Sequence, residues 1–237
     1  MNCLEVKKLR SGYGSRNVLF DVSLSVGAGK VVGIVGPNGH GKTTLLKTIS
    51  GLITASDGDI RFKGSSIRGR SPHDIARLGV SHVPQGDLLF PQMTVWENLM
   101  MGAFRESDPT TTKRRLDLAV RLFPKLTQLE KKVVRSLSGG ERRMVGIGRG
   151  LMAAADLIMI DEPSLGLAPL VIDQVYAAIN EIRAAGVSVL LVEENPERAA
   201  SMADYLYLVD NGSVKWQGDQ EAFKSAGREL IQTYLGS

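Results

Sequence analysis

A glycine-rich segment at residues 36–43 has the composition and spacing of a phosphate-binding loop. It fits the pattern G-x-x-x-x-G-K-[ST] at every fixed position. Glycines let the backbone close around phosphate oxygens without a Cβ in the way, and the N–H groups at a helix start favour anions. The residues expected to contact phosphate are Gly36, Pro37, Asn38, Gly39, His40, Gly41, Lys42, Thr43 and Thr44.

The last two residues of this loop have distinct expected roles. Lys42 places its charge on the β- and γ-phosphates, and the Thr43 hydroxyl ligates Mg²⁺. The alternative is a chance glycine turn with a solvated lysine. The flanking sequence argues against that alternative, because a short apolar run at 30–35 precedes the loop and a helical segment at 44–50 follows it. We therefore expect ATP and Mg²⁺ as ligands.

Two adjacent carboxylates, Asp161 and Glu162, follow a buried apolar strand at 157–160. In a chain with a phosphate loop, this pair suits the second half of a nucleotide site. Asp161 is expected to hold Mg²⁺, directly or through water, and Glu162 to orient and deprotonate the attacking water. The alternative is an acidic turn without a ligand.

Two further residues are candidates because of their position. Gln85 follows a strand at 80–83, and parallel α/β sheets place ligand-binding groups at the carboxyl ends of their strands. Tyr13 lies between glycines in a predicted loop, where it could stack on a nucleobase. A plain loop amide and a plain loop aromatic remain the alternatives for these two residues.

A second helix start with accessible N–H groups is predicted at residues 137–141. Ser138 and Glu141 form a capping box, and Gly139 and Gly140 leave the backbone N–H groups open to an anion. The alternative is a capped helix with no ligand. We expect Ser138, Gly139 and Gly140 to contact nucleotide.

The pattern of hydrophobic residues predicts an α/β chain. Strands are expected near 4–9, 18–26, 30–35, 59–62, 80–83, 157–160 and 188–192, followed by a hairpin at 205–217 with an Asn-Gly turn. Helices are expected near 44–50, 72–78, 94–104, 111–123, 139–154 and 169–185, with short helices at 221–235. This predicts three parts: 1–85, with N-terminal antiparallel strands; 86–154, all helical; and 155–237, which completes the α/β core.

Composition excludes several classes of protein. The chain has 237 residues and one cysteine, Cys3, so no internal disulfide can form. No apolar run approaches the roughly 18 residues of a membrane span, and the N-terminal residues have no apolar signal core. Residues 113–149 carry eleven Lys or Arg against three acids. That segment is either a solvated helical face or a face near anionic lipid or an acidic partner; it lacks the interleaved aromatics of a nucleic-acid surface.

Together these motifs resemble the ATP-binding subunits of ABC transporters. Residues 36–43 match the Walker A loop, Gln85 the Q-loop, residues 137–141 the ABC signature, residues 157–161 the Walker B strand and Tyr13 the aromatic A-loop. The resemblance implies a P-loop NTPase (RecA-like) core with an antiparallel β subdomain and an inserted helical subdomain. It implies ATP hydrolysis, with Glu162, Lys42 and Gln85 as catalytic residues and Thr43, Gln85 and Asp161 as Mg²⁺ ligands.

The same resemblance implies partners and a location. Two ATPase chains, identical or not, would pack head-to-tail, so that the signature helix of one faces the phosphate loop of the other. Integral membrane permease subunits and a solute-binding protein would complete the complex, with this chain peripheral at the cytoplasmic face of the inner or plasma membrane. Residues 90–102, 147–152 and 161–169 are similar to branched-chain amino acid importers and to systems for urea and short amides. A lipid or lipopolysaccharide exporter and a soluble, non-transport ABC ATPase are the alternatives.

Three residues depart from the family pattern. His40 stands where the family usually has Ala or Ser, and it is expected near the phosphates. Arg142 replaces a common Gln after the signature. Glu194 occupies the switch position, where most members have His, and its charge would oppose the γ-phosphate. For that reason Glu194 is not assigned a catalytic role.

Overall fold

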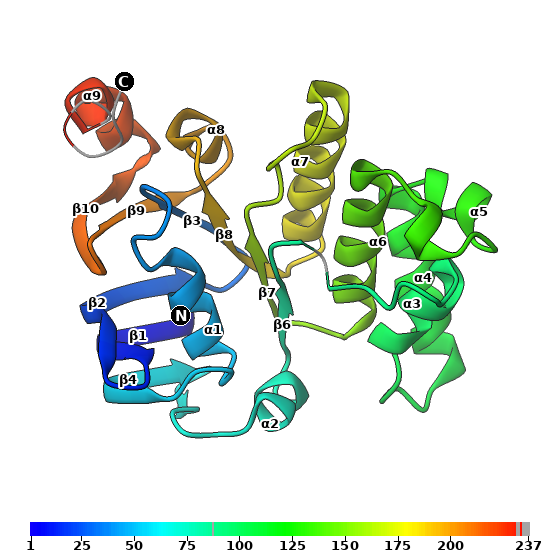
Figure 1. Cartoon of the computed structure of the whole chain (residues 1–237), viewed down its shortest axis with the longest axis horizontal. Coiled ribbons are helices and arrows are strands. Elements are labelled where there is room, and N and C mark those ends of the chain that lie inside the picture. Colours follow the sequence, from blue (N-terminus) through cyan, green and yellow to red (C-terminus); the bar gives the residue numbers. More distant parts are fainter. Residues whose placement is uncertain (87, 231–232, 234–237) are drawn as a thin grey trace.

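The structure is a computed structural model that describes residues 1–86, 88–230 and 233, and its two β-sheets lie on either side of helix α1 (Lys42–Ile49) (Figure 1). The larger sheet has the order β10-β9-β3-β8-β7-β6, in which only β10 runs antiparallel to its neighbour. Its strands are β3 (Val31–Val35), β6 (Val80–Val83), β7 (Leu157–Asp161), β8 (Ser188–Glu193), β9 (Tyr205–Asp210) and β10 (Ser213–Asp219).

The smaller sheet is antiparallel and has the order β2-β1-β4-β5. Its strands are β1 (Asn2–Tyr13), β2 (Arg16–Gly27), β4 (Ala55–Phe62) and β5 (Ser65–Ser66). This mixture of a parallel core sheet and an antiparallel sheet confirms the predicted fold class.

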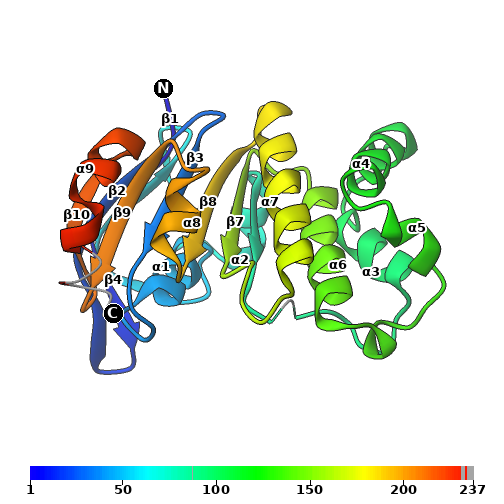
Figure 2. The same cartoon turned by 90° about the horizontal axis from the view of Figure 1, so that it is seen from above.

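Two apolar layers hold the larger sheet in place. One face, with Ile34 and Leu190, packs on α1 residues such as Leu45 and on the smaller sheet. The other face, with Ile160 and Leu191, packs on the helices that cover it in Figure 2: α6 (Gly139–Met152), α7 (Pro169–Ala184) and α8 (Pro196–Ala200). Because its central strands are buried on both faces, they consist of continuous apolar runs rather than alternating ones.

The segment between β6 and β7 is helical among its described residues. It contains α3 (Val95–Gly102), α4 (Pro109–Leu122), α5 (Lys125–Leu129), a 3₁₀ turn at Val134–Ser136 and α6. The predicted capping box is present at Ser138–Glu141, and another capping box is present at Thr94–Glu97. Elsewhere, α2 (Pro72–Arg77) precedes β6, and α9 (Gln220–Leu230) follows β10. The division at residues 85/86 and 154/155 stays a prediction.

Several details differ from the predictions. Tyr13 is the last residue of β1, paired with Arg16, and not a loop residue, because the hairpin closes through a two-residue turn. In β2, Phe20 is 46% exposed and its neighbour Leu19 is fully buried, although Val22, Leu24 and Val26, at the alternate positions that follow Phe20, are buried. The β1–β2 register shifts along this stretch, and Asp21 has a φ of 52°, so the side chains change face.

The shortest elements were not predicted. Strand β5 and helices α5 and α8 have five residues or fewer, too few for a hydrophobic period to show. At the C-terminus, α9 begins at Gln220, one residue before the predicted helical stretch, and Leu235 lies outside the described residues. No helix of the described chain is both long and apolar enough to cross a bilayer.

Candidate functional site

The candidate site residues follow the carboxyl ends of four parallel strands. The phosphate loop follows β3, Gln85 follows β6, Glu162 follows β7, and Glu194 follows β8. These strands are neighbours in the order β3-β8-β7-β6 and run parallel, so the loops that follow them meet at one edge of the sheet. The sheet therefore brings residues together that lie up to 158 positions apart in the sequence.

The conformation of the phosphate loop requires glycine. Gly36 has a φ of 153°, and a Cβ there would lie 2.0 Å from the carbonyl oxygen of Val209. Gly41 is the N-cap of α1 with a φ of 102° and supplies no side-chain cap. The first N–H groups of α1 therefore have no capping oxygen, which makes this helix start an anion-binding site.

Lys42 is 3% exposed, and its ammonium group lies against the loop itself. Nζ donates to the carbonyl oxygens of Gly36 at 2.7 Å and Pro37 at 2.9 Å. Nζ is also 3.9 Å from Oε1 of Glu162. Burial lowers the pKa of Lys42, and the surrounding carboxylates, Glu162 first among them, act in the opposite direction. A buried cation held mainly by carbonyl oxygens suits a polyphosphate ligand.

Glu162 and Gln85 are in direct contact. The side-chain amide of Gln85 donates a hydrogen bond of 2.7 Å to Oε2 of Glu162. Burial raises the pKa of the Glu162 carboxyl, while the charge of Lys42 lowers it. A carboxylate with a raised pKa is a better general base than a solvated one.

The residues at the end of β7 fit a divalent cation. Asp161 is fully buried, and neither of its carboxylate oxygens has a hydrogen-bond partner among the described residues. Burial raises the pKa of Asp161, and the nearby Thr43 hydroxyl and Lys42 charge lower it. Buried oxygens without partners are costly unless a ligand is bound, and Mg²⁺ prefers carboxylate and hydroxyl oxygens. Thr43 and Asp161 are therefore the residues that could hold Mg²⁺.

The side chain of His40 does not face Lys42. Its Nδ1 lies 2.6 Å from Oδ1 of Asp210, and its backbone oxygen accepts from the N–H of Gly212 at 3.0 Å. Both partners belong to the turn region between β9 and β10. The imidazole thus holds the phosphate loop against this hairpin. Only the backbone of His40 is then available to contact phosphate.

The remaining candidate residues lie at the periphery of the site. Tyr13 is 51% exposed at the end of β1 and is open to a ligand. The signature residues Ser138 and Gly139 begin α6, which is separated from α1 by β6 and β7 in Figures 1 and 2. In the described part of the chain, no hydrogen bond joins residues 138–140 to the phosphate loop.

Two groups of residues around the site were missed by the sequence analysis. Arg143 is buried on α6 and binds backbone carbonyls beside Gln85 and Glu162. Glu193 is buried at the end of β8 and accepts from the hydroxyls of Tyr176 and Ser164. The sequence signal for Arg143 is a charged residue within a stretch of α6 that is otherwise expected to be buried. The sequence analysis treats Arg143 only as one of the basic residues of segment 113–149.

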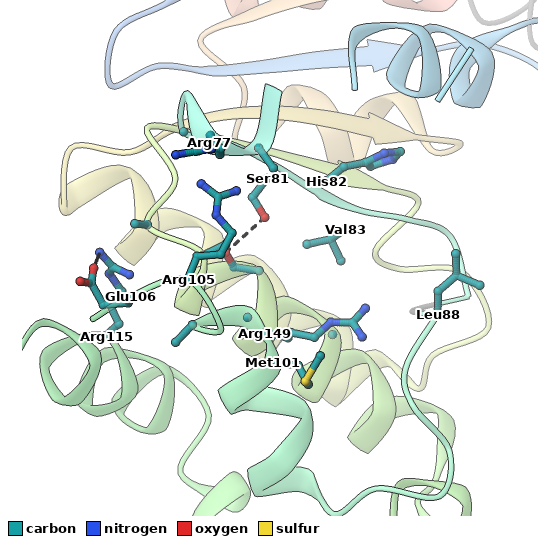
Figure 3. A pocket seen from close by; sticks show the side chains of 18 of the residues that line it. Arg77, Ser81, His82, Val83, Leu88, Met101, Arg105, Glu106, Arg115 and Arg149 are labelled. Carbon is teal, nitrogen blue, oxygen red and sulfur yellow. Dashed lines mark hydrogen bonds and ion pairs between the residues drawn. The ribbon is translucent and has the colours of Figure 1, made fainter. Parts of the chain in front are cut away.

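A groove of about 560 Å³ lies apart from these residues (Figure 3). It runs between α2, β6 and the ends of α3 and α6. Exposed apolar side chains line it, with Leu88 72% and Phe90 42% exposed. Its described charged lining residues are Arg77, Arg105, Glu106, Arg115 and Arg149.

Known proteins share this fold and a substantial part of this sequence. The family model described as "ABC transporter" matches residues 19–165. The chain is 40% identical over 233 residues to the high-affinity branched-chain amino acid transport ATP-binding protein BraG of Pseudomonas aeruginosa, covering 98% of this chain and 99% of that protein. It is 37% identical to the probable branched-chain amino acid transport ATP-binding protein LivF of Archaeoglobus fulgidus, covering 97% and 94%.

Two further similarities have a bearing on function. The lipopolysaccharide export system ATP-binding protein LptB of Haemophilus influenzae is 33% identical, with 100% of this chain and 98% of that protein covered. An ATP-binding cassette of an ABC transporter, solved in its ADP conformation, superposes with a TM-score of 0.84 at 28% identity over 100% of both chains. On this evidence the chain belongs to the ATP-binding subunits of the ABC transporter family, and it binds and hydrolyses ATP.

Proposed function

We propose that this chain energises an importer of branched-chain amino acids or of related small solutes such as urea and short amides. The observation that carries the proposal is the 40% identity to BraG over almost the full length of both chains. The identity to LptB, at 33%, supports the second candidate, a lipid or lipopolysaccharide exporter. The identity to BraG is the higher of the two, so import is the first choice.

The phosphate loop binds the triphosphate of ATP. Lys42 exchanges its contacts with the Gly36 and Pro37 carbonyls for the β- and γ-phosphate oxygens, and the free N–H groups of α1 complete the cradle. Thr43, Asp161 and Gln85 would hold Mg²⁺. When bound, Mg²⁺ neutralises charge on the β- and γ-phosphates. Tyr13 stacks on the adenine.

Glu162 receives the proton of the attacking water. In this structure, Gln85 donates to Oε2 of Glu162, which occupies one oxygen of the base. Release of Gln85 from Glu162 frees that oxygen for water. Positioning and charge stabilisation supply most of the catalysis in phosphoryl transfer, so Lys42 and the loop N–H groups contribute alongside the base.

A second ATPase chain completes each site. Among the described residues, the N–H groups of Gly139 and Gly140 at the start of α6 have no hydrogen-bond partner, and residues 138–140 lie away from the phosphate loop of their own chain. Head-to-tail packing of two chains brings this helix start to the γ-phosphate of the partner. ATP thereby joins the two chains, and its hydrolysis releases them.

The permease binds at the groove of Figure 3. Leu88, Phe90 and Met101 offer apolar contact, and the charged lining is mostly arginine. A cytoplasmic permease segment with apolar and acidic side chains fits this lining. The chain is thus peripheral at the cytoplasmic face of the inner or plasma membrane, in a complex that includes a solute-binding protein.

Affinity capture from gently solubilised native membranes, with partners identified by mass spectrometry, tests the proposal. We expect a polytopic permease, a solute-binding protein and, for a heterodimer, a second ATPase. The matched experiment is uptake of labelled leucine, urea and acetamide in cells that carry the unchanged chain or Glu162→Gln. We expect the variant to abolish uptake of one of these solutes.

The outcomes separate the candidates. A permease without a solute-binding protein, together with unchanged uptake and defective outer-membrane lipid, supports the exporter. Recovery of ribosomal or DNA-bound partners without a membrane protein contradicts transport altogether. Loss of capture by Arg105→Glu, with ATP hydrolysis retained, supports docking at the groove.

A further inference from the structure

Arg143 is a buried arginine that binds the backbone on both sides of the hydrolysis site. It is 5% exposed and lies on α6, five residues after the helix N-cap Ser138. Nη1 donates to the carbonyl oxygen of Pro84 at 3.1 Å. Nη2 donates to the backbone carbonyl oxygens of Asp161 at 2.9 Å and Glu162 at 2.5 Å, and Nε donates to that of Pro163 at 3.3 Å.

These carbonyls belong to two segments that are distant in the sequence. Pro84 directly precedes Gln85 at the end of β6, whereas residues 161–163 follow β7. The side chains of Gln85 and Glu162 meet at 2.7 Å. One guanidinium on the signature helix therefore fixes the backbones from which both of these side chains project.

The backbone that Arg143 holds is a strained one. Glu162 has a φ of 46°, in the left-handed region that residues with a Cβ rarely adopt. Its N–H donates to the carbonyl of Val192 at 2.9 Å, and its own carbonyl accepts from Arg143. Contacts on both of its peptide groups hold Glu162 in this conformation, which brings its carboxylate to Gln85 and Lys42.

Only a guanidinium can make this set of contacts. Arginine has five donors in a rigid planar fork, whereas lysine presents one compact ammonium group. Carbonyl dipoles also offset the cost of burying the charge.

We propose that Arg143 is a positioning residue for hydrolysis. It fixes the positions of Glu162 and Gln85 relative to each other and to the signature helix, α6. Movement of α6 when a second chain binds is passed through this guanidinium to the base and to Gln85. The inference rests on the proposed roles of Glu162 and Gln85. It assigns no contact between Arg143 and the nucleotide.

The test compares Arg143→Gln and Arg143→Lys with Arg142→Gln. Arg142 is the matched control because it is exposed on the same helix and donates to the carbonyl of Leu137 instead. For each variant, kcat, KM and the Kd of ATP are measured at a temperature well below the midpoint of its thermal unfolding. The folded fraction is measured by circular dichroism. Because both substitutions remove hydrogen bonds from a charged guanidinium, kcat should fall about 10- to 100-fold in both Arg143 variants. The Kd of ATP should change by less than about threefold, since the phosphate loop is untouched.

Several results would overturn the proposal: full kcat in Arg143→Lys, a loss of kcat that follows the folded fraction, or an equal loss in Arg142→Gln. The variant Glu162→Gln, run in parallel, separates this inference from the site assignment. If Glu162→Gln still hydrolyses ATP, the assignment of the base is wrong whatever Arg143 does. If Glu162→Gln is inactive and the Arg143 variants are normal, only the positioning role is wrong.

Discussion

The side-chain amide of Asn38 donates a hydrogen bond of 3.0 Å to Oε1 of Glu194, and this contact joins the phosphate loop to the end of β8. Oδ1 of the same Asn38 lies 3.5 Å from Nζ of Lys42. Glu194 therefore does not point away from the phosphate site. It places a negative charge beside the loop that must accept the triphosphate.

Replacing Glu194 by Gln should keep or raise ATPase activity. The glutamine oxygen can still accept from Asn38, while the charge that opposes the γ-phosphate is removed. Steady-state ATPase assays should show kcat equal or higher and KM for ATP equal or lower. The control is Glu197→Gln, which removes one negative charge from an exposed position on α8. It should change neither kcat nor KM. A collapse of activity in Glu194→Gln would show that its carboxylate takes part in hydrolysis.

Replacing Tyr13 by Ala should weaken ATP binding through loss of base stacking. Stacking of an aromatic side chain on a base contributes about 1–3 kcal/mol, so the Kd of ATP should rise about tenfold. Tyr13→Phe should retain the affinity, and tripolyphosphate, which has no base, should bind the variant normally. Phe20→Ala is the matched control, because Phe20 is a similarly exposed aromatic on the neighbouring strand. Equal loss of tripolyphosphate affinity would assign Tyr13 a structural role instead.

Replacing His40 by Ala should lower stability more than it affects nucleotide binding. The imidazole binds Asp210 at 2.6 Å, and a lost hydrogen bond to a charged group costs about 1.5–3 kcal/mol. Urea denaturation should show this loss, whereas KM for ATP should stay close to that of the unchanged chain. The control is His73→Ala, whose ring is 63% exposed beside Asp74. A large rise in KM at unchanged stability would place the ring on the phosphates after all.

The features predicted correctly from the sequence depend on neighbouring residues. Three examples each depend on residues only a few positions apart in the sequence. They are the strand before Gly36, the capping box of Ser138 and Glu141, and the apolar strand that ends at Asp161. Local propensity and hydrophobic period suffice for such elements. These elements also fix which strand ends carry candidate residues, and therefore most of the site.

The contacts within the site could not be predicted in the same way. Gln85 and Glu162 are 77 positions apart, and Asn38 and Glu194 are 156 apart. Their pairing depends on strand order and on the rotamers that the packed sheet allows. The hydrogen bonds from Lys42 to the carbonyl oxygens of Gly36 and Pro37 likewise depend on the loop conformation, which the spacing of the motif does not specify.

The start of the signature helix should lose stability as the pH falls below about 4.5. Oε2 of Glu141 accepts from the N–H of Ser138 at 2.8 Å, and Oε1 lies 3.0 Å from Nζ of Lys125. The hydrogen bond from Ser138 is the main cause that lowers the pKa of Glu141 from 4.5 to about 2, and Lys125 is the next. Because the folded pKa is depressed, the stabilisation is complete above the unfolded value of 4.5 and is lost as the pH falls through about 2.

The variant Glu141→Gln isolates this effect. At pH 7 it should unfold about 1 kcal/mol more easily, because the charged cap and the contact with Lys125 are lost. Urea denaturation at a series of pH values should show this difference shrinking toward pH 2, since protonation removes the same charge from the unchanged chain. Glu181→Gln, an exposed residue on α7, provides the control and should show no such convergence. If the gap between Glu141→Gln and the unchanged chain stays constant from pH 7 to pH 2, the ionised cap does not stabilise the helix start.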